Sequence, residues 1–207
     1  MTDPDALQSK KTVLNVGGNS KAIAIPQHFE GWTHHLLDID PRGKPDIVCD
    51  ARKLAALAPN GYDAVYCSHN LEHYFAHDVP KVLGGFHHVL KSDGFAEIRV
   101  PDIAQLIRIV AEKDLDLLDV LYQSKAGPVR VRDVLYGFGP EIERSGQDFY
   151  AHKTGFSPKS LVLALRECAF PHQIILRANL EIRAYAFKHK PDAEQLASLG
   201  LRSKVHP

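Results

Sequence analysis

The sequence predicts an α/β domain with a mostly parallel seven-stranded sheet, helices on both faces, and an antiparallel hairpin at its C-terminal end. Short apolar runs alternate with helical patterns along most of the chain, and parallel strands require such crossover connections. The last two strand-like runs are joined by only a short link, which is typical of a hairpin. A length of 207 residues is enough for one large domain with its own core.

The predicted strands are apolar runs that end at glycine, proline or aspartate. They cover residues 12–16, 33–39, 46–49, 62–67, 94–100, 173–177 and 181–187. Apolar residues at helical spacing predict helices at 51–57, 78–90 and 103–110, and a second amphipathic stretch at 115–122. Ser157 as N-cap and Pro158 in the first turn begin one more helix.

These elements divide the chain into three parts. Residues 1–10 read as a flexible arm, 11–189 as a single domain, and 190–207 as a flexible tail. Within the domain, residues 102–156 form a helical insertion between the fifth strand and the last large helix. Loops and insertions over a rigid sheet commonly set specificity.

Composition excludes several classes of protein. Basic and acidic residues number 25 each, so a neutral chain lacks the broad positive field that nucleic-acid or membrane-surface binding needs. The N-terminus is polar, and no apolar run approaches the ~20 residues of a membrane span. The three cysteines, Cys49, Cys67 and Cys168, have no C-x-x-C spacing. We therefore expect a reduced, cytoplasmic chain without a disulfide framework.

Polar residues follow the predicted strands at the edge where open α/β sheets bind ligands. Gly17 and Gly18 form a turn after the first strand, and Asp38 ends the second, at the distance typical of an acid that accepts from ribose hydroxyls. Asp50 follows the third strand, where it can accept from an exocyclic amine or cap a helix. Asp40, before a proline, fits a turn cap.

A histidine-rich segment follows the fourth strand. His69, Glu72 and His73 match the H-x-x-E-H pattern of a zinc protease group. Zinc needs both histidines on one helical turn and a third ligand, whereas His69 sits at a strand end. Zinc hydrolysis is therefore a minor alternative, and we expect no metal site.

The order of these pieces resembles that of a known family. The matching segments are VLNVGGN, LLDIDP, DIVCDARKL, YDAVYCSHNLEH, VLKSDGFAEIRVPD and HKTGFSPKSL, followed by the hairpin. Together they resemble a class I S-adenosylmethionine-dependent methyltransferase, of the subgroup with Leu-Glu-His after the fourth strand, over roughly residues 12–189. The resemblance implies a Rossmann-like methyltransferase sandwich with S-adenosylmethionine as cofactor.

The resemblance also implies a role for each strand end. The first loop lies under the methionine part of the cofactor, the second strand end holds the ribose, the third holds adenine, and the fourth lies beside the methionine moiety. The implied cofactor-binding residues are Val16, Gly17, Gly18, Asn19, Asp38, Ile39, Asp50, Ala51, Arg52, Ser68, His69, Asn70 and His73.

The first loop departs from the family pattern of an acid followed by G-x-G-x-G. Asn15 replaces the acid, and Asn19 and Lys21 replace the later glycines. These changes remove a charge partner for the cofactor's ammonium group, limit backbone approach, and place a lysine that can repel a sulfonium. A non-catalytic cofactor-binding protein is therefore an open alternative.

The family reaction is in-line displacement of a methyl group from the sulfonium, here toward a small polar acceptor. A hydroxyl acceptor needs a neutral histidine within reach, and His69 and His152 are the candidates. His152 can equally pack or cap the next helix. We expect four residues of the insertion to contact the acceptor, namely Arg130, Tyr136, Tyr150 and His152, although the insertion can also be a solvated cap or a dimer surface.

The neutral charge makes nucleic acid an unlikely acceptor, and the chain is expected to be a monomer or a homodimer. A nicotinamide-dependent oxidoreductase is a further alternative. That class requires G-x-G-x-x-G after the first strand, whereas this loop provides only the first pair of glycines, and the closing hairpin fits that fold poorly.

Overall fold

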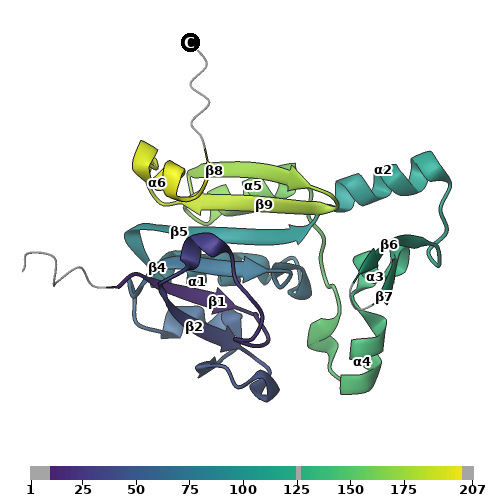
Figure 1. Ribbon diagram of the computed structural model, residues 1–207, viewed down its shortest axis with the longest axis horizontal. Helices are drawn as coiled ribbons and strands as arrows, with labels where there is room; N and C mark the ends of the chain where they lie inside the picture. Colours follow the sequence, from purple (N-terminus) through teal and green to yellow (C-terminus); the bar gives the residue numbers. More distant parts are fainter. Residues whose placement is uncertain (1–9, 125–126, 202–207) are drawn as a thin grey trace, which may run out of the picture.

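The computed structural model describes residues 10–124 and 127–201, and a seven-stranded sheet forms their centre (Figure 1). The strands lie in the order β3-β2-β1-β4-β5-β9-β8. Their bounds are β1 Thr12–Val16, β2 Thr33–Asp38, β3 Ile47–Val48, β4 Tyr62–Ser68, β5 Leu90–Pro101, β8 His172–Ala178 and β9 Glu181–Phe187.

The first five strands pair in parallel, and β9 pairs antiparallel with both β5 and β8. The predicted sheet and closing hairpin are therefore confirmed. The main difference is that β5 begins four residues before the predicted strand, because Leu90 pairs with Tyr62 across an irregularity in the β4–β5 register.

One face of the sheet carries the larger hydrophobic core. It is covered by α1 (Val79–Val89), by α5 (Pro158–Glu167), and by the 3-10 helix η3 (Ala51–Ala56), which packs on α1. The predicted helix at 78–90 is confirmed as α1, and Ser157 caps α5 by accepting from the backbone N–H of Ser160. The predicted helix at 51–57 is a 3-10 helix.

The opposite face is covered differently. The connection from β1 to β2 contains only the 3-10 helix η1 (Gln27–Phe29), and that from β2 to β3 contains only η2 (Pro41–Gly43). Phe29 of η1 packs on this face beside α6 (Ala193–Ser198) and the two leucines that follow it. A short C-terminal helix thus covers the sheet where these two connections supply no α-helix.

Helix α6 lies within the expected flexible tail, so that prediction is wrong for residues 193–201. Asp192 caps the helix by accepting from the N–H of Gln195 at 2.7 Å. Leu199 and Leu201 are buried against the sheet, and burial of their side chains holds the segment in place. Residues 1–9 of the expected arm and 202–207 of the tail lie outside the described residues.

The insertion lies beyond the carboxyl ends of the parallel strands (Figure 1). It contains α2 (Ile103–Lys113), β6 (Val120–Ser124), β7 (Gly127–Arg130), α3 (Val131–Tyr136), α4 (Gly139–Ser145) and the 3-10 helix η5 (Asp148–Tyr150).

The insertion is therefore not wholly helical, and the helix predicted at 115–122 is wrong. Strand β6 occupies part of that stretch and pairs antiparallel with β7. Asp116 and Asp119 explain the difference, because each carboxylate accepts a local backbone N–H and turns the chain between α2 and β6. Across the described residues, none of the helices combines the length and apolarity that crossing a membrane requires.

Candidate functional site

Two cavities open at the carboxyl ends of the strands. The first, here called the strand-end cavity, is lined by Gly17, Asn19, Asp38, Ile39, Asp50, Arg52, His69, Asn70, His73, Tyr74, Phe75, Asp78, Phe149, Tyr150 and Lys153. The second, the insertion cavity, is lined by His69, Pro101, Tyr122, Val129, Asp133, Val134, Phe138, His152, Asn179, Leu180 and Glu181. His69 lines both cavities, so they adjoin at this residue.

The loop after β1 forms the floor of the strand-end cavity. Gly17 has a φ of +72°, and a Cβ at this position would lie 2.1 Å from the side-chain nitrogen of Asn70. Asn19 has a φ of +59°, a left-handed conformation that asparagine tolerates better than most residues. Asn19 thus takes over the backbone conformation that a glycine would supply in the family loop.

The other two departures from the family pattern in this loop, Asn15 and Lys21, also have a structural explanation. Asn15 is buried, and a Cβ on Gly18 would lie 2.2 Å from its side-chain nitrogen, so the second glycine makes room for the asparagine. Lys21 forms an ion pair of 2.6 Å with Asp46 and does not line the strand-end cavity. The charge of Lys21 is therefore paired with Asp46, away from the lining of the strand-end cavity.

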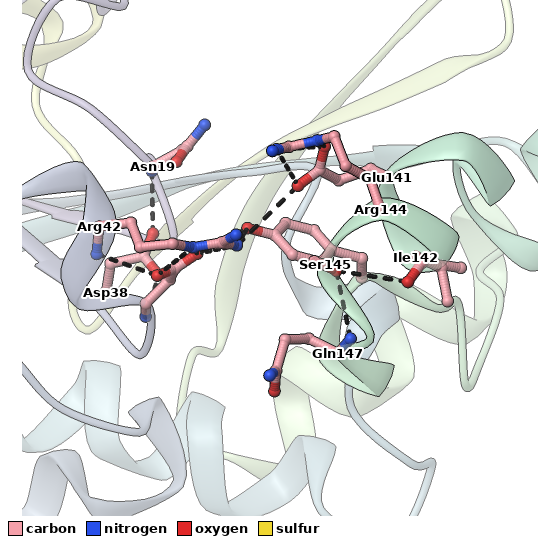
Figure 2. Close-up of polar contacts among 10 residues, drawn as sticks. Asn19, Asp38, Arg42, Glu141, Ile142, Arg144, Ser145 and Gln147 are labelled. Carbon is pink, nitrogen blue, oxygen red and sulfur yellow. Dashed lines mark hydrogen bonds and ion pairs between the residues drawn. The ribbon is translucent and has the colours of Figure 1, made fainter.

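Asp38 ends β2 with a fixed carboxylate. One oxygen accepts from the backbone N–H of Asn19 at 2.9 Å, and the other accepts from that of Asp40 at 2.9 Å (Figure 2). The side chain lines the strand-end cavity, and the residue is only 8% exposed. The β1 loop and the acid at the end of β2 thus hold each other in position.

Asp40 is the turn cap that its position suggested, and it also contacts the insertion. Its carboxylate accepts from Arg42 at 2.5 Å and from the Tyr150 hydroxyl at 2.8 Å. These hydrogen bonds hold the pKa of Asp40 well below its usual range. Burial and the bond to Asp40 raise the pKa of Tyr150 to about 12. Arg42 also lies 3.9 Å from Glu141 of α4, which pairs with Arg144 (Figure 2).

Asp50 combines the two roles that the sequence left open. Its carboxylate caps η3 by accepting from the backbone N–H of Arg52, and it pairs with the Arg52 guanidinium at 2.6 Å. The same residue lines the strand-end cavity. Burial opposes ionisation, but the bonds from Arg52 outweigh it and lower the pKa of Asp50.

His69 lies where β4 ends, in a left-handed conformation with a φ of +49°. Its Nε2 is 3.1 Å from a Glu181 oxygen, and its Nδ1 is 3.5 Å from a Glu72 oxygen. Burial lowers the pKa of the imidazole, but these two carboxylates outweigh it and raise the pKa to about 9. An imidazolium cannot accept a proton, so His69 lacks at neutral pH the property that a general base requires.

His73, His152 and Glu72 form a compact group below the insertion. The Nδ1 of His73 lies 3.1 Å from the carbonyl of Ala151, and the Nδ1 of His152 lies 2.9 Å from that of Val134. The two rings are 5.0 Å apart. Burial lowers the pKa of His152, and Glu72 is almost completely buried. The sequence did not predict this group, because His152 lies far along the chain from Glu72 and His73.

Most of the predicted cofactor-binding residues line the strand-end cavity. They are Gly17, Asn19, Asp38, Ile39, Asp50, Arg52, His69, Asn70 and His73. Val16 and Ala51 are instead buried in the core, where only their backbone can face a ligand. Gly18 and Ser68 line a smaller neighbouring cavity beside Tyr66.

The predicted acceptor-binding residues separate into two pairs. Tyr150 lines the strand-end cavity, and His152 lines the insertion cavity. Arg130 lines neither, because its guanidinium donates to the carbonyl of Leu118. Tyr136 is 62% exposed at the end of α3 and also lines neither cavity. The structure thus does not bring Arg130 and Tyr136 to the site.

Sequence reasoning missed several residues that line the strand-end cavity. Phe75 and Lys153 come from different segments, and the Lys153 ammonium lies 5.4 Å from the centre of the Phe75 ring. Phe149 belongs to the polar and aromatic segment before α5, and its ring packs on Tyr150. Tyr74 and Asp78 lie in the segment between β4 and α1, but no spacing rule distinguishes them from core or capping residues.

Comparisons with known proteins bear on the fold and on the first half of the domain. Residues 11–98, which span β1 to β5, match the family model of a methyltransferase domain. A S-adenosylmethionine-dependent methyltransferase from Archaeoglobus fulgidus has a similar structure, with 15% identity, a TM-score of 0.54, and coverage of 86% of this chain and 86% of that chain. A search of curated proteins finds no significant relative.

Two further solved structures are similar. The PH0226 protein from Pyrococcus horikoshii OT3 has 13% identity and a TM-score of 0.55, over 88% of this chain and 84% of that chain. A S-adenosylmethionine-dependent methyltransferase from Methanosarcina mazei has 13% identity and a TM-score of 0.53, over 89% and 95% respectively. At such low identity these neighbours show the fold alone, and the match to a methyltransferase domain is confined to residues 11–98. Residues 11–98 therefore match a methyltransferase domain, and the fold is similar to those of solved S-adenosylmethionine-dependent methyltransferases.

Proposed function

We propose that this protein is a methyltransferase that transfers the methyl group of S-adenosylmethionine to a small polar acceptor held under the insertion. The observation that carries the proposal is the meeting of two cavities at His69. The strand-end cavity contains the glycine of the β1 loop and acids at the ends of β2 and β3, and the insertion cavity lies beside it. In-line displacement needs such a pair of adjoining sites, with donor and acceptor on opposite sides of the methyl group.

The strand-end cavity is the proposed cofactor site. Asp38 would accept from the ribose hydroxyls, because its carboxylate faces the cavity and its position is fixed by two backbone N–H groups. Asp50 would accept from the adenine amine. Gly17 and Asn70 would lie beside the methionine part, where the backbone is open to close approach.

The insertion cavity is the proposed acceptor site. Its lining combines aromatic, apolar and charged side chains, including Tyr122, Asp133 and Phe138, which suits a small molecule with polar groups. His152 is the proposed residue that acts on the acceptor from this cavity, since its Nδ1 lies beside the Val134 carbonyl and its Nε2 is on the side of the buried Glu72 carboxylate. Assignment to the Leu-Glu-His subgroup rests on Leu71, Glu72 and His73 alone and stays a prediction.

Calorimetric titration of the full chain with S-adenosylmethionine, and separately with NADH, tests the cofactor. We expect saturable binding of S-adenosylmethionine and none of NADH. The opposite result would favour an oxidoreductase. Methyl transfer is then followed with labelled cofactor and a panel of small hydroxyl, thiol and amine acceptors. Tight cofactor binding without transfer to any acceptor would favour a non-catalytic binding protein.

A further inference from the structure

Glu72 presents a buried carboxylate with no hydrogen-bond partner among the described residues. The side chain is 1% exposed, and neither of its oxygens accepts a hydrogen bond. The ring nitrogens nearest to it are His69 Nδ1 at 3.5 Å and His152 Nε2 at 3.9 Å, and both distances are longer than an ordinary charge-assisted hydrogen bond. A carboxylate buried in this way is costly unless a cation balances it.

Two histidine side chains are directed at the same point. A ring N–H of His73 can donate through Nδ1 to the Ala151 carbonyl, and one of His152 can donate through Nδ1 to the Val134 carbonyl. Each bond fixes the tautomer that leaves the Nε2 lone pair free. Histidines that bind a metal almost always donate their other ring N–H to a carbonyl or carboxylate in this way.

We propose that Glu72, His73 and His152 bind one Zn²⁺ ion between the strand-end and insertion cavities. One ligand atom of each residue lies within 4.8 Å of the other two. Tetrahedral coordination with bonds of about 2.0–2.1 Å requires ligand atoms about 3.4 Å apart. Small side-chain rotations toward a common centre would bring the ligand atoms from their present separations to this spacing.

The donor set selects the metal. Two imidazole nitrogens and one carboxylate suit zinc, and three protein ligands leave a fourth position for water or for an oxygen of the acceptor. That position lies where the two cavities meet, because His73 lines the strand-end cavity and His152 lines the insertion cavity. In terms of the proposed function, on which this role rests, the ion would bind the acceptor and ease loss of its proton.

The backbone holds the third ligand in place. The carbonyl of Glu72 accepts from the N–H groups of Lys153 at 2.8 Å and Thr154 at 3.1 Å, the two residues after His152. The end of the insertion is thus fastened to the segment that carries the other ligands. The ligand set also differs from the H-x-x-E-H pattern, since His152 replaces His69, which faces Glu181 instead.

Metal binding is measured directly on the purified full chain. After chelation and dialysis, the protein is titrated with Zn²⁺ and its bound metal is determined by inductively coupled plasma mass spectrometry. We expect about one zinc per chain, as three ligands of one site require. Titration with Co²⁺, which reports its coordination through visible absorption, should give the spectrum of a tetrahedral or five-coordinate site. Octahedral Co²⁺ only, or no zinc above background, would overturn the proposal.

Substitutions locate the site. His73→Asn and Glu72→Gln should each weaken zinc binding by more than the about 10- to 100-fold that loss of an outer-shell partner costs. His172→Asn, an exposed residue at the start of β8, is the matched control and should bind as the wild type does. Equal zinc binding by wild type and both site variants would show that the ion is held elsewhere.

Two controls keep the result decisive. Circular dichroism melting identifies a variant that fails to fold, and the Co²⁺ spectrum of the wild-type chain needs no substitution. Titration with S-adenosylmethionine is run on the metal-free protein. Cofactor binding without zinc binding would overturn the metal site and leave the proposed function standing. Zinc binding without cofactor binding would support the metal site and overturn the proposed function, including the role of the ion toward an acceptor.

Discussion

The hydroxyl of Tyr150 lies 2.8 Å from a carboxylate oxygen of Asp40 and donates to it, which joins the insertion to the end of β2. Arg42 donates to both residues. The contact bridges 110 positions of the sequence and stands at the rim of the strand-end cavity, which Tyr150 lines. The insertion is thus tied to the proposed cofactor site at Asp40 as well as at Glu72.

Tyr150→Phe tests the strength of this link. Removing the hydroxyl should lower the free energy of unfolding by about 0.5–1.5 kcal/mol, the net value of one hydrogen bond. Urea denaturation measures it. Amide hydrogen exchange should also become faster in α4 and η5. Tyr136→Phe, which alters an exposed tyrosine, is the control and should change neither quantity. Equal exchange in both variants would mean that Tyr150 does not anchor the insertion.

Asp38→Ala should weaken the binding of S-adenosylmethionine by about tenfold or more, which corresponds to about 1.4 kcal/mol. The carboxylate is the proposed acceptor for the ribose hydroxyls, and it also positions Asn19. Calorimetric titration gives the Kd. Asp93→Ala, at an exposed residue near the start of β5, is the matched control. An unchanged Kd in a folded Asp38→Ala protein would show that the ribose assignment is wrong.

Two glycine substitutions should act in opposite directions. Gly17→Ala should lower both stability and cofactor affinity, because φ is positive there and the new Cβ would meet Asn70. Gly84→Ala should raise the free energy of unfolding by about 0.5–1 kcal/mol, since Gly84 lies in α1 with open space around its Cβ position. Thermal melting and calorimetry measure the two effects. Retained affinity in Gly17→Ala would argue against close backbone approach at this loop.

Acid should weaken the protein through Asp40. Its pKa is lower in the folded state than in the unfolded chain, so its contribution to stability is complete above the unfolded pKa of about 3.9 and is lost as the pH falls below it. Asp40→Asn lacks this contribution. The difference in unfolding free energy between wild type and Asp40→Asn should therefore shrink from pH 6 toward pH 2 in urea titrations. Glu112→Gln, at an exposed carboxylate of α2, serves as the control. A constant difference would contradict the assignment.

His152→Ala should reduce kcat for an identified acceptor by about 100-fold or more, the usual effect of losing a group that handles the acceptor's proton. His69→Ala should reduce it less, because both nitrogens of His69 face carboxylates and neither is free for the acceptor. Steady-state kinetics at saturating cofactor compares the two variants. If His69→Ala has the larger effect, the contact is assigned to the wrong histidine. If neither matters, transfer relies on positioning alone.

Local patterns were sufficient for the frame of the fold. Strands β1 to β5, the closing hairpin, α1 and the cap of α5 follow from apolar runs and from capping residues that lie next to one another in the sequence. The strand-end residues Gly17, Asp38, Asp50 and Asn70 could also be placed together, because parallel strands bring their carboxyl ends to one edge. The local sequence patterns gave wrong predictions in two places. A helix was predicted where β6 begins, and a flexible tail was predicted where α6 lies.

Charge and hydrogen bonding between distant segments could be known only from the tertiary structure. Sequence alone predicted that His69 and His152 lie near the reacting groups. Only the folded chain decided that His69 faces Glu181, 112 positions away, and that His152 meets Glu72 and His73. It also placed Arg130 and Tyr136 away from both cavities. The physical reason is that strand periodicity and capping are short-range, whereas a side chain's partner depends on how the insertion packs on the sheet.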